Sequence, residues 1–348
     1  MPTVVFRVNS GPKVGLGHLQ RCLSLASALS AQSMQSHFVI MRDGKGRASI
    51  EEHGYDVTEI SETAAAKKDL EVTLKKLERL QGKVVVVDCR CAGTDYLREL
   101  RRTGYYVVSI DDLAEIAFPS HLVINGNVYA RKLSYRADSE GAVFLLGPEY
   151  AILDDEFWHI SRNKAKEAVG NVSIILGGSD IRSLTGRLLR LLDGLPGKFS
   201  VTAIVGPYCQ IVQEVEKVAS QCSRLSRVIH APQSLKAILS GTDLAISGGG
   251  QTLNMLARVG CPTVAVEVAP DQRQNIETLA EVGAVRAVRL GRNDELDGIR
   301  DAVVSLLWDT EARQMMGTAG QRLIDGQGAL RVSKAIVSGI GGWQDDSA

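Results

Sequence analysis

The sequence carries no excess of charge of either sign, since 40 lysines and arginines are balanced by 40 aspartates and glutamates among 348 residues. Nucleic acids and anionic membrane surfaces are attracted by a broad positive field, which this composition does not provide. We therefore expect no nucleic-acid partner, and an anionic ligand must be held by local groups. The sequence carries no signal of oligomeric state.

Long apolar runs are also missing. No segment approaches the roughly 18 consecutive uncharged apolar residues of a membrane-spanning helix. The opening MPTVVFRVNS lacks the basic stretch and apolar core of a secretory signal. We expect no membrane insertion and a cytoplasmic location.

The cysteine pattern of a zinc site is absent. The six cysteines form no CxxC pair, and no histidine lies near them at zinc spacing. We expect reduced, mostly buried thiols, no metal and no cofactor. Cys89 and Cys91 are the exceptions to watch, because they flank a predicted strand end.

The length and composition predict two globular domains. At 348 residues the chain is long for one α/β domain and sufficient for two. With 45% hydrophobic and 23% charged residues, it resembles neither a disordered chain nor a coiled coil. We expect domains at residues 1–165 and 166–340. The charged stretch EYAILDDEFWHISRNKAKEAVGN has a helical pattern and should connect them, with the boundary near residues 162–170.

Apolar β-branched runs alternate with segments of helical periodicity, which predicts an α/β fold with parallel sheets. The clearest helices are expected at residues 19–31 and 69–80. A last helix at 311–324 precedes a glycine-rich end that we expect to be frayed. Strands are expected at residues 4–8, 37–41, 84–87, 106–110, 122–124, 172–176, 200–205, 227–229, 244–246 and 263–266.

Polar or glycine-rich residues follow most of these strands. In an open parallel sheet the ligand lies beyond the carboxyl ends of the strands. In the first half these positions hold NSGPKVGLGH, Asp88, the pair Asp111 and Asp112, and NGN at residues 125–127. In the second half they hold GGSD, GP, SGGGQT and EVAPDQRQN. We expect two facing rims of one ligand-binding cleft.

The GLGH segment lies directly before a predicted helix. Its glycines, Gly15 and Gly17, permit a tight turn, and the free N–H groups of a helix start attract negative charge. The segment is not a dinucleotide fingerprint, because Gln20 stands where the third glycine would be, and it lacks the lysine of a P-loop. His18 places an imidazole at this helix start, so we take it as the candidate reacting group.

SGGGQT also precedes a predicted helix. Three consecutive glycines have a high entropic cost, which indicates that their backbone contacts something, and a diphosphate is the natural ligand. The alternative is a flexible turn, and the same choice applies to GGSD. Asp88, Asp111 and Asp112 fit either an acid, base or sugar-binding role or a helix N-cap.

These segments together resemble the UDP-sugar hydrolase family of the pseudaminic-acid pathway, which is related in fold to the peptidoglycan N-acetylglucosaminyltransferase. The resemblance spans about residues 6–275. It is carried by FRVNSGPKVGLGHLQRCLSLA, SIDDLAE, INGNVYA, GPEYAILDDEFW, IILGGSD, TDLAISGGGQT and PDQRQN. It implies the GT-B architecture, in which two Rossmann-like domains bind a nucleotide sugar.

The resemblance also implies roles for individual residues. His18 falls on the family's general base, which takes a proton from water as that water attacks the anomeric carbon and UDP leaves with inversion. A diphosphate is a good leaving group, so no second carboxylic acid is required. The first half would bind the sugar through Asn9, Gly15, Gly17, Asp88, Asn125 and Asn127. The second half would bind UDP through Gly177, Gly178, Ser179, Ile229, Ser247, Gly248, Gly249, Gly250, Gln251, Thr252, Asn254, Gln272 and Asn275.

The chain departs from its relatives at two positions. Relatives carry an aromatic residue two positions after the aspartate of the third strand, where this chain has Arg90. Related GT-B proteins place a ribose-binding glutamate where this chain has Met255, and a methionine accepts no such hydrogen bonds. Either Asn254 replaces the glutamate, or the nucleotide is held differently, or it is not UDP.

Three other functions compete with hydrolysis. Glycosyl transfer would use the same fold and the same base, with another hydroxyl in place of water. A catalytically silent nucleotide-sugar binder is the second alternative. A nicotinamide-dependent oxidoreductase is disfavoured by Gln20, and only Asp43 is available as the acid that would bind the ribose.

Overall fold

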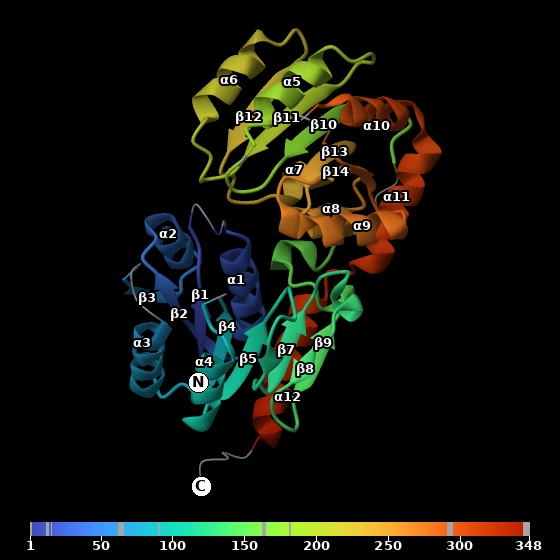
Figure 1. The fold of residues 1–348 in the computed structure, drawn as a ribbon. Helices are drawn as coiled ribbons and strands as arrows, with labels where there is room; N and C mark the ends of the chain where they lie inside the picture. Colours follow the sequence, from blue (N-terminus) through green and yellow to red (C-terminus); the bar gives the residue numbers. More distant parts are fainter. Residues whose placement is uncertain are drawn as a thin grey trace. The chain divides into compact units, whose positions relative to one another are not determined.

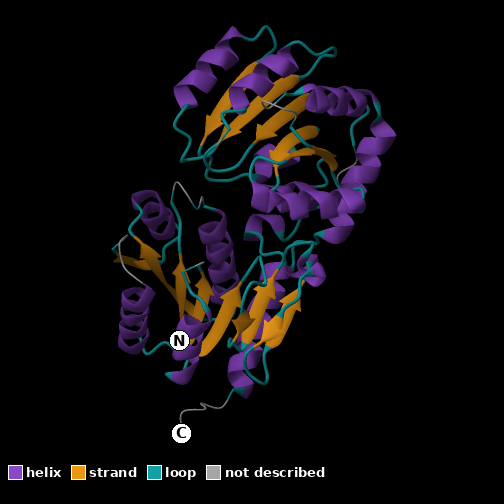
Figure 2. Cartoon of the chain, in the orientation of Figure 1, coloured by secondary structure: helices purple, strands orange, loops and turns teal. Residues whose placement is uncertain are grey.

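The computed structural model describes residues 2–11, 14, 16–61, 66–89, 91–161, 165–180, 182–290 and 295–343. The chain divides into two compact units. Unit 1 comprises Met1–Asp155 and Gly326–Ala348, and unit 2 comprises Glu156–Asp325. Helices and strands alternate through both units (Figure 2).

Unit 1 is built on a seven-stranded parallel sheet with the order β3-β2-β1-β4-β5-β7-β9. The strands are β1 (Thr3–Val8), β2 (Gln35–Met41), β3 (Asp56–Ile60), β4 (Val84–Asp88), β5 (Tyr106–Ile110), β7 (Leu122–Asn125) and β9 (Val143–Leu146). The short strands β6 (Ala117–Phe118) and β8 (Arg136–Ala137) pair separately. The helices are α1 (Gly17–Ser30), α2 (Gly44–Glu52), α3 (Ala66–Arg79), α4 (Thr94–Arg102) and α12 (Gly328–Gly342).

Unit 2 is built on a six-stranded parallel sheet with the order β12-β11-β10-β13-β14-β15. Its strands are β10 (Asn171–Ile175), β11 (Ser200–Val205), β12 (Ser226–His230), β13 (Leu244–Gly248), β14 (Thr263–Val266) and β15 (Arg286–Val288). Its helices are α5 (Thr185–Asp193), α6 (Val212–Gln221), α7 (Lys236–Ser240), α8 (Gln251–Val259), α9 (Arg273–Glu281), α10 (Asp297–Trp308) and α11 (Thr310–Leu323). Figure 1 shows α5 and α6 on one face of this sheet and α8 and α9 on the other.

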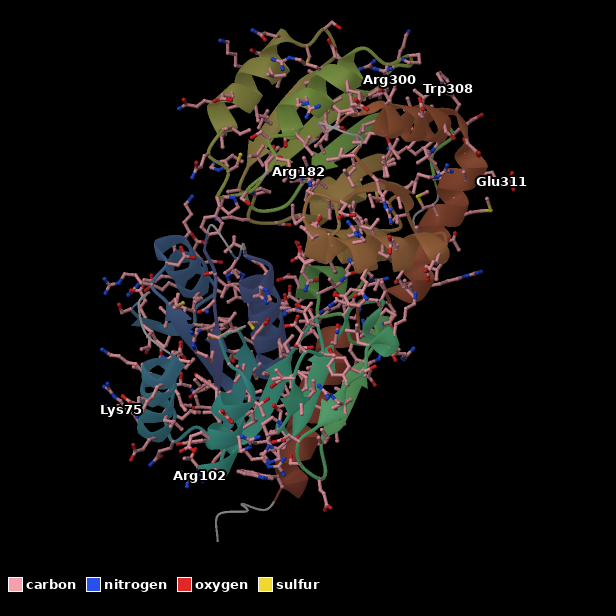
Figure 3. The ribbon with its side chains drawn as sticks, viewed as in Figure 1. Lys75, Arg102, Arg182, Arg300, Trp308 and Glu311 are labelled. Carbon is pink, nitrogen blue, oxygen red and sulfur yellow. A yellow bond between two sulfur atoms is a disulfide. The ribbon has the colours of Figure 1, made fainter. Side chains whose placement is uncertain are left out.

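Burial of continuous apolar strands explains both sheets. In β4 the run of four valines at residues 84–87 is buried throughout, as expected of a parallel strand covered by helices on both faces. The covering helices are amphipathic, with Leu97 of α4 and Leu188 of α5 among their buried residues. Charged side chains such as Lys75 on α3 and Arg102 on α4 point into solvent (Figure 3).

The strand orders locate the ligand-binding edge of each unit. Both sheets have the Rossmann order, in which the direction of strand addition reverses beside the first strand. The reversal lies between β1 and β4 in unit 1 and between β10 and β13 in unit 2. Ligands bind outside the carboxyl ends of the strands at this point. The predicted α/β fold with two Rossmann-like domains is confirmed, and all ten predicted strands are present.

The expected domain boundary at 165/166 differs from the observed division, and the chain end was assigned to the wrong half. The chain leaves unit 1 after Asp155 and returns to it at Gly326. The returning segment is helix α12 rather than a frayed tail. A Cβ at Gly328 would lie 2.1 Å from the carbonyl oxygen of Ala151, and one at Gly339 would lie 2.0 Å from the hydroxyl of Tyr106. These glycines therefore serve close packing, a purpose that composition does not reveal.

The connecting stretch at residues 149–171 is also different from the prediction. Instead of one charged α-helix, its described part contains the end of the 3-10 helix Pro148–Tyr150, the whole 3-10 helix Asp155–Phe157 and the first residue of β10. Arg258 of α8 donates hydrogen bonds to the carbonyls of Phe157, Trp158 and Ile160. The backbone of this segment thus finds its partners on a neighbouring helix, which local periodicity cannot predict. Part of the predicted boundary, residues 162–164, lies outside the described residues.

The expectation of six reduced thiols is wrong for two of them. Cys89 and Cys91 form a disulfide, with their Cα atoms 5.3 Å apart, within the normal range for disulfides. Cys22, Cys209 and Cys261 are buried free thiols, and Cys222 is half-buried. Among the described residues, no helix combines the length and apolar composition that crossing a bilayer requires.

His37 of β2 makes the stability of unit 1 depend on pH. Its side chain is buried, with Nε2 2.9 Å from the hydroxyl of Thr58, and burial together with the charge of Lys76 lowers the pKa to about 4. The unfolded chain takes up this proton near pH 6.5, so the stabilisation is complete above that pH and is lost as the pH falls toward 4. We expect His37→Gln to reduce the fall in unfolding free energy across this window, measured by urea denaturation. The matched control is His53→Gln at an exposed histidine, and a wild-type pH dependence in His37→Gln would contradict the account.

Candidate functional site

His18 lies in the first turn of α1, just beyond the carboxyl end of β1. The side chain of its N-cap residue, Leu16, makes no capping hydrogen bond. The imidazole is 23% exposed, and its Nδ1 lies 2.7 Å from Oδ1 of Asp88, the last residue of β4. The pair therefore spans the reversal point between β1 and β4, where a Rossmann sheet binds its ligand.

Arg21 joins the same group one turn further along α1. Its Nε and Nη2 donate to the two oxygens of Asp88 at 2.6 and 2.7 Å. Its Nη1 and Nη2 donate to the two oxygens of Asp112 at 2.8 and 2.9 Å. Residues three apart share a helix face, so α1 presents His18 and Arg21 together. We call His18, Arg21, Asp88 and Asp112 the His18 cluster.

The hydrogen-bond geometry assigns the tautomer of His18. An ionised Asp88 only accepts, so the 2.7 Å contact requires Nδ1 to carry the proton and donate it. The two hydrogens of Arg21 Nη2 are directed to Asp88 and Asp112, although Nδ1 of His18 lies 2.9 Å away. Among the described residues, Nε2 of His18 has no hydrogen-bond partner. Its lone pair is therefore available to take a proton.

The charges of the cluster keep Asp88 ionised. Burial disfavours its carboxylate, which is 2% exposed, but Arg21 and His18 outweigh burial and hold the pKa of Asp88 well below its ordinary value. Arg21 likewise lowers the pKa of Asp112 against the effect of burial. Burial and the neighbouring Asp88 raise the pKa of the Cys22 thiol, which therefore stays neutral. Asp88 thus remains an acceptor for His18 across the neutral range.

The prediction that Asp88 and Asn125 bind a sugar directly does not fit their surroundings. Asp88 gives both oxygens to Arg21 and His18. Asn125 has no exposed surface, donates to Tyr135 and accepts from Asn127. Asn127 in turn donates to Asp112 at 2.6 Å. Asp88 and Asn125 therefore position their neighbours in the site. Both side chains are buried at strand ends, so neither has surface left for a ligand.

Asn9 is oriented by a buried ion pair. Arg7 has no exposed surface and pairs with Asp69. Its Nη1 donates to Oδ1 of Asn9 at 2.7 Å, and its Nη2 lies 3.6 Å from Sγ of Cys91. Asn9 is only half-buried, so a binding role for it stays a prediction. Gly17 opens α1 as expected, whereas Gly15 and Arg90 lie outside the described residues.

Two other aspartates of unit 1 have structural roles. Asp111 accepts hydrogen bonds from the backbone N–H groups of Leu113 and Ala114. Asp43, the only acid considered for a nicotinamide ribose, caps α2 by accepting from Gly46 N–H. Asp43 is therefore a helix N-cap, whereas Asp111 stabilises the turn after β5, because β6 is the next described element and no helix begins there.

In unit 2 the glycine turn, which we define as Ser247–Gly250, joins β13 to α8. The N-cap residue of α8 is Gly250, which has no side chain to cap the helix. A Cβ added at Gly250 would have no atom within 4 Å, whereas one at Gly249 would lie 2.7 Å from Ile276. Gly250 is thus the exposed residue of the turn, Gln251 and Thr252 at the start of α8 are half-buried, and Ser247 is buried. Uncapped N–H groups at a helix start suit an anion.

Gln272 and Asn275 support the glycine turn. Oε1 of Gln272 accepts from Gly249 N–H at 2.9 Å and from Val268 N–H at 3.3 Å. Asn275, on α9, donates to the carbonyl of Gly249 at 2.8 Å. The two side chains come from the segment that follows β14, the neighbouring strand, and they hold the turn in place. Direct contact between either residue and a ligand remains a prediction.

Two buried acceptors lie next to this turn. Oδ1 of Asn254 and Oδ1 of Asn275 are buried and have no hydrogen-bond partner in the structure. Asn254 is 3% exposed, and its amide lies 3.4 Å from Oε1 of Gln251. Buried polar atoms without partners are costly, which favours a bound donor such as a hydroxyl or a water.

The remaining predicted nucleotide residues lie at the same edge of unit 2. Gly177, which is separated from the end of β10 by Leu176, adopts a positive φ of 98°, and the carbonyl of Gly178 accepts from Tyr208 N–H. Asp180, which ends the GGSD segment, accepts from the N–H groups of Leu184 and Thr185 and so caps α5. Ser179 follows Gly178, and Ile229 is half-buried near the end of β12. These placements agree with a carboxyl-end rim, and binding itself stays a prediction.

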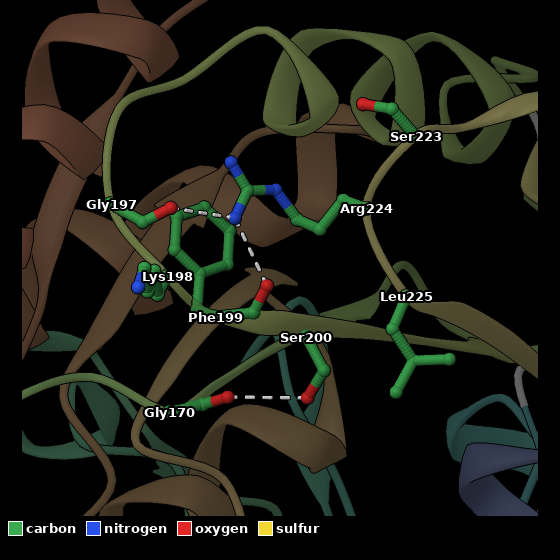
Figure 4. Close-up of a pocket in the computed structure, with 8 residues that line it drawn as sticks. All are labelled: Gly170, Gly197, Lys198, Phe199, Ser200, Ser223, Arg224 and Leu225. Atoms are coloured by element: carbon green, nitrogen blue, oxygen red, sulfur yellow. Dashed lines mark hydrogen bonds between the residues drawn. The ribbon is translucent and has the colours of Figure 1, made fainter.

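A shallow pocket of about 490 Å³ lies at the opposite edge of unit 2 (Figure 4). It is formed where β10, β11 and β12 begin, away from the ligand-binding edge. Arg224 stacks 3.8 Å above the ring of Phe199 and donates to four backbone carbonyls. Its hydrogen-bond donors are therefore already used within the protein, and we do not take this pocket as the functional site. The lining residues are Gly170, Gly197, Lys198, Phe199, Ser200, Ser223, Arg224 and Leu225.

Sequence reasoning missed the part of Arg21 in the site. Its spacing of three residues from His18 on a predicted helix was the available signal. Asp112 was weighed only as one of three ambiguous aspartates. Within the described part of the chain, no group of three or more histidines, cysteines, aspartates and glutamates could hold a metal ion.

Gln272→Ala should destabilise unit 2, because Gly249 N–H would lose its acceptor. We expect the unfolding free energy to fall by about 1 to 3 kcal/mol, the usual cost of an unsatisfied buried donor. Chemical denaturation measures this change, and Gln274→Ala, at an exposed position of α9, is the matched control. Equal stability of the two variants would show that Gln272 does not support the turn.

Comparison with curated proteins finds distant relatives, and no protein-family model matches the chain. A protein of Methanocaldococcus jannaschii described as uncharacterized is 25% identical over 75% of this chain, which spans only 55% of that relative's length. The spore coat polysaccharide biosynthesis protein SpsG of Bacillus subtilis is 22% identical over 94% of this chain and 96% of its own. The UDP-2,4-diacetamido-2,4,6-trideoxy-beta-L-altropyranose hydrolase of Campylobacter jejuni is 25% identical over 70% of this chain and 84% of its own.

Solved structures show the same fold at low sequence identity. MurG of Acinetobacter baumannii has a TM-score of 0.70 at 17% identity, covering 97% of this chain and 100% of its own. The spinosyn rhamnosyltransferase SpnG, complexed with thymidine diphosphate, has a TM-score of 0.64 at 17% identity over 97% and 99%. MnaA of S. aureus, in a structure with UDP, has a TM-score of 0.63 at 12% identity over 98% and 97%. The chain therefore has the fold of the GT-B glycosyltransferases.

Proposed function

We propose that the protein is a nucleotide-sugar hydrolase that cleaves a UDP-linked deoxy amino sugar at its anomeric carbon. The observation that carries this proposal is the oriented imidazole of His18. Nδ1 donates to an ionised Asp88, and Nε2 is left without a protein partner. This is the arrangement of a general base held by a carboxylate. The named activity of the Campylobacter jejuni relative supports the choice of substrate class.

In the proposed reaction, Nε2 of His18 takes a proton from water while the water oxygen bonds to the anomeric carbon. The bond between that carbon and the diphosphate oxygen breaks, and its electron pair leaves with UDP. His18 becomes an imidazolium stabilised by Asp88. The cluster thus supplies the base, and no protein nucleophile or second acid is required.

The glycine turn is the proposed diphosphate site. The accessible N–H groups at the start of α8 and the positive end of the helix dipole favour a departing diphosphate. The nucleoside diphosphates bound to SpnG and MnaA support this ligand class. Asn254 is the proposed substitute for a ribose-binding glutamate, since its unpartnered Oδ1 can accept from a ribose hydroxyl.

Glycosyl transfer is the second candidate, because several proteins that share this fold are named as glycosyltransferases. The base would be the same, with a sugar or peptide hydroxyl in place of water. Product analysis with and without an added acceptor separates the two reactions. Free sugar formed at the same rate without an acceptor supports hydrolysis.

Gly250→Val tests the diphosphate site. The position is open and has an extended backbone conformation, so the fold should survive while a branched side chain covers the N–H groups. We expect UDP to lose its stabilising effect, which for the parent should reach about 2.7 kcal/mol at a hundredfold excess over its dissociation constant. Gly249→Val is a poorer test, because its side chain would displace Ile276. Parental UDP binding by Gly250→Val would move the site elsewhere.

His18→Asn tests the base. The substitution keeps a polar side chain and should retain UDP binding, but turnover should fall by roughly 10²- to 10⁴-fold, as expected for loss of a general base. The acidic limb of the pH–rate profile should disappear with it. The measurement is UDP release from the substrate named for the hydrolase relative. A variant with weakened binding and parental kcat would assign His18 to binding alone.

A further inference from the structure

The His18 cluster contains one more carboxylate than a histidine base needs. Asp88 accepts the hydrogen bond from the ring, yet Arg21 also forms a two-point ion pair with Asp112. Asp112 follows β5, whereas Asp88 ends β4, so two strand ends supply the acids. The role of the second acid is not explained by contact with His18, since none is found.

The net charge of the cluster shows what a proton on His18 would change. Two carboxylates and one guanidinium leave a net charge of −1 while His18 is neutral. One proton taken up by His18 therefore makes the cluster neutral. Without Asp112, the charges of Arg21 and Asp88 would already cancel, and a proton on His18 would leave a positive charge in a largely buried group.

The hydrogens on Nη2 of Arg21 indicate a second effect of Asp112. Nη2 of Arg21 has two hydrogens and three neighbours, which are Oδ1 of Asp88 at 2.7 Å, Oδ2 of Asp112 at 2.9 Å and Nδ1 of His18 at 2.9 Å. Asp112 takes the hydrogen that would otherwise turn to His18. If Nδ1 accepted that hydrogen, the ring proton would move to Nε2 and the base would be lost.

We propose that Asp112, acting through Arg21, is a positioning residue that keeps the ring proton of His18 on Nδ1 and so leaves Nε2 basic. The catalytic meaning of this inference rests on the proposed function, whereas the tautomer itself does not. Asp112 is held from its other side by Asn127, which donates to its Oδ1 at 2.6 Å. Asn127 is in turn held by the buried Asn125. The two asparagines thereby connect β7 to the base.

The titratable groups that face His18 come from three elements. Asp88 ends β4, Asp112 follows β5, and Arg21 with Cys22 lies on α1. Burial keeps the Cys22 thiol protonated, so it adds no charge. The ionised partners of His18 across the neutral range are therefore Arg21, Asp88 and Asp112.

The test is a nitrogen-15 NMR measurement of the His18 ring in the full chain, without substrate. The wild-type ring should carry its proton on Nδ1. Asp112→Asn offers one acceptor oxygen instead of two, so we expect the Nε2–H tautomer to become populated. Asp95→Asn, the same substitution at an exposed position of α4, should leave the ring unchanged.

Kinetics provide the second readout. Asp112→Asn should lower kcat with little change in KM, and by less than the roughly 10²- to 10⁴-fold expected for loss of the base itself. A wild-type ring protonated on Nε2, or an unchanged ring in Asp112→Asn, would overturn the inference. The wild-type spectrum decides the first point even if a variant fails to fold.

The two proposals can fail separately. If the ring responds to Asp112→Asn but the protein releases no UDP from a UDP sugar, the positioning role stands and the proposed function fails. If UDP is released while the ring does not respond, the function stands and Asp112 has another role.

Discussion

The candidate chemistry of this protein depends on one interaction, the bidentate pairing of Arg21 with two carboxylates. A buried guanidinium between Asp88 and Asp112 offsets the free-energy cost of removing three charged groups from water. Breaking either pair would leave an uncompensated charge at a strand end. Because Asp88 is fixed in this way and accepts from Nδ1, Nε2 is the ring nitrogen of His18 that is left to accept a proton. The packing of α1 on the β1 strand end therefore determines where a proton can be accepted.

The two units share one sheet topology but place different chemical groups at its reversal point. Each sheet has the Rossmann order, and each presents its candidate site residues at the reversal point. In unit 1 the reversal point holds charged side chains, whereas in unit 2 it holds backbone N–H groups and a glycine turn supported by Gln272 and Asn275. The fold positions both sets. The chemistry comes from the residues that follow the strands.

Much of this arrangement could be predicted from local sequence. Valine runs such as that of β4 predict buried parallel strands, and the residues after those strands include His18, Asp88 and the glycine turn. Non-local packing was not predictable. The return of α12 to unit 1 depends on glycines that allow close contact, and the role of Arg21 depends on acids from two other strands. Gln272 illustrates the same limit, since its hydrogen bond to the glycine turn joins residues 23 positions apart.

The central claim is that water attacks the sugar carbon and not the phosphorus. Hydrolysis of the UDP sugar in water enriched in oxygen-18, followed by mass spectrometry of both products, tests this claim most directly. The account predicts that the label enters the free sugar and that the released UDP is unlabelled. Label in the phosphate of the nucleotide would contradict it and would remove the anomeric carbon as the site of attack.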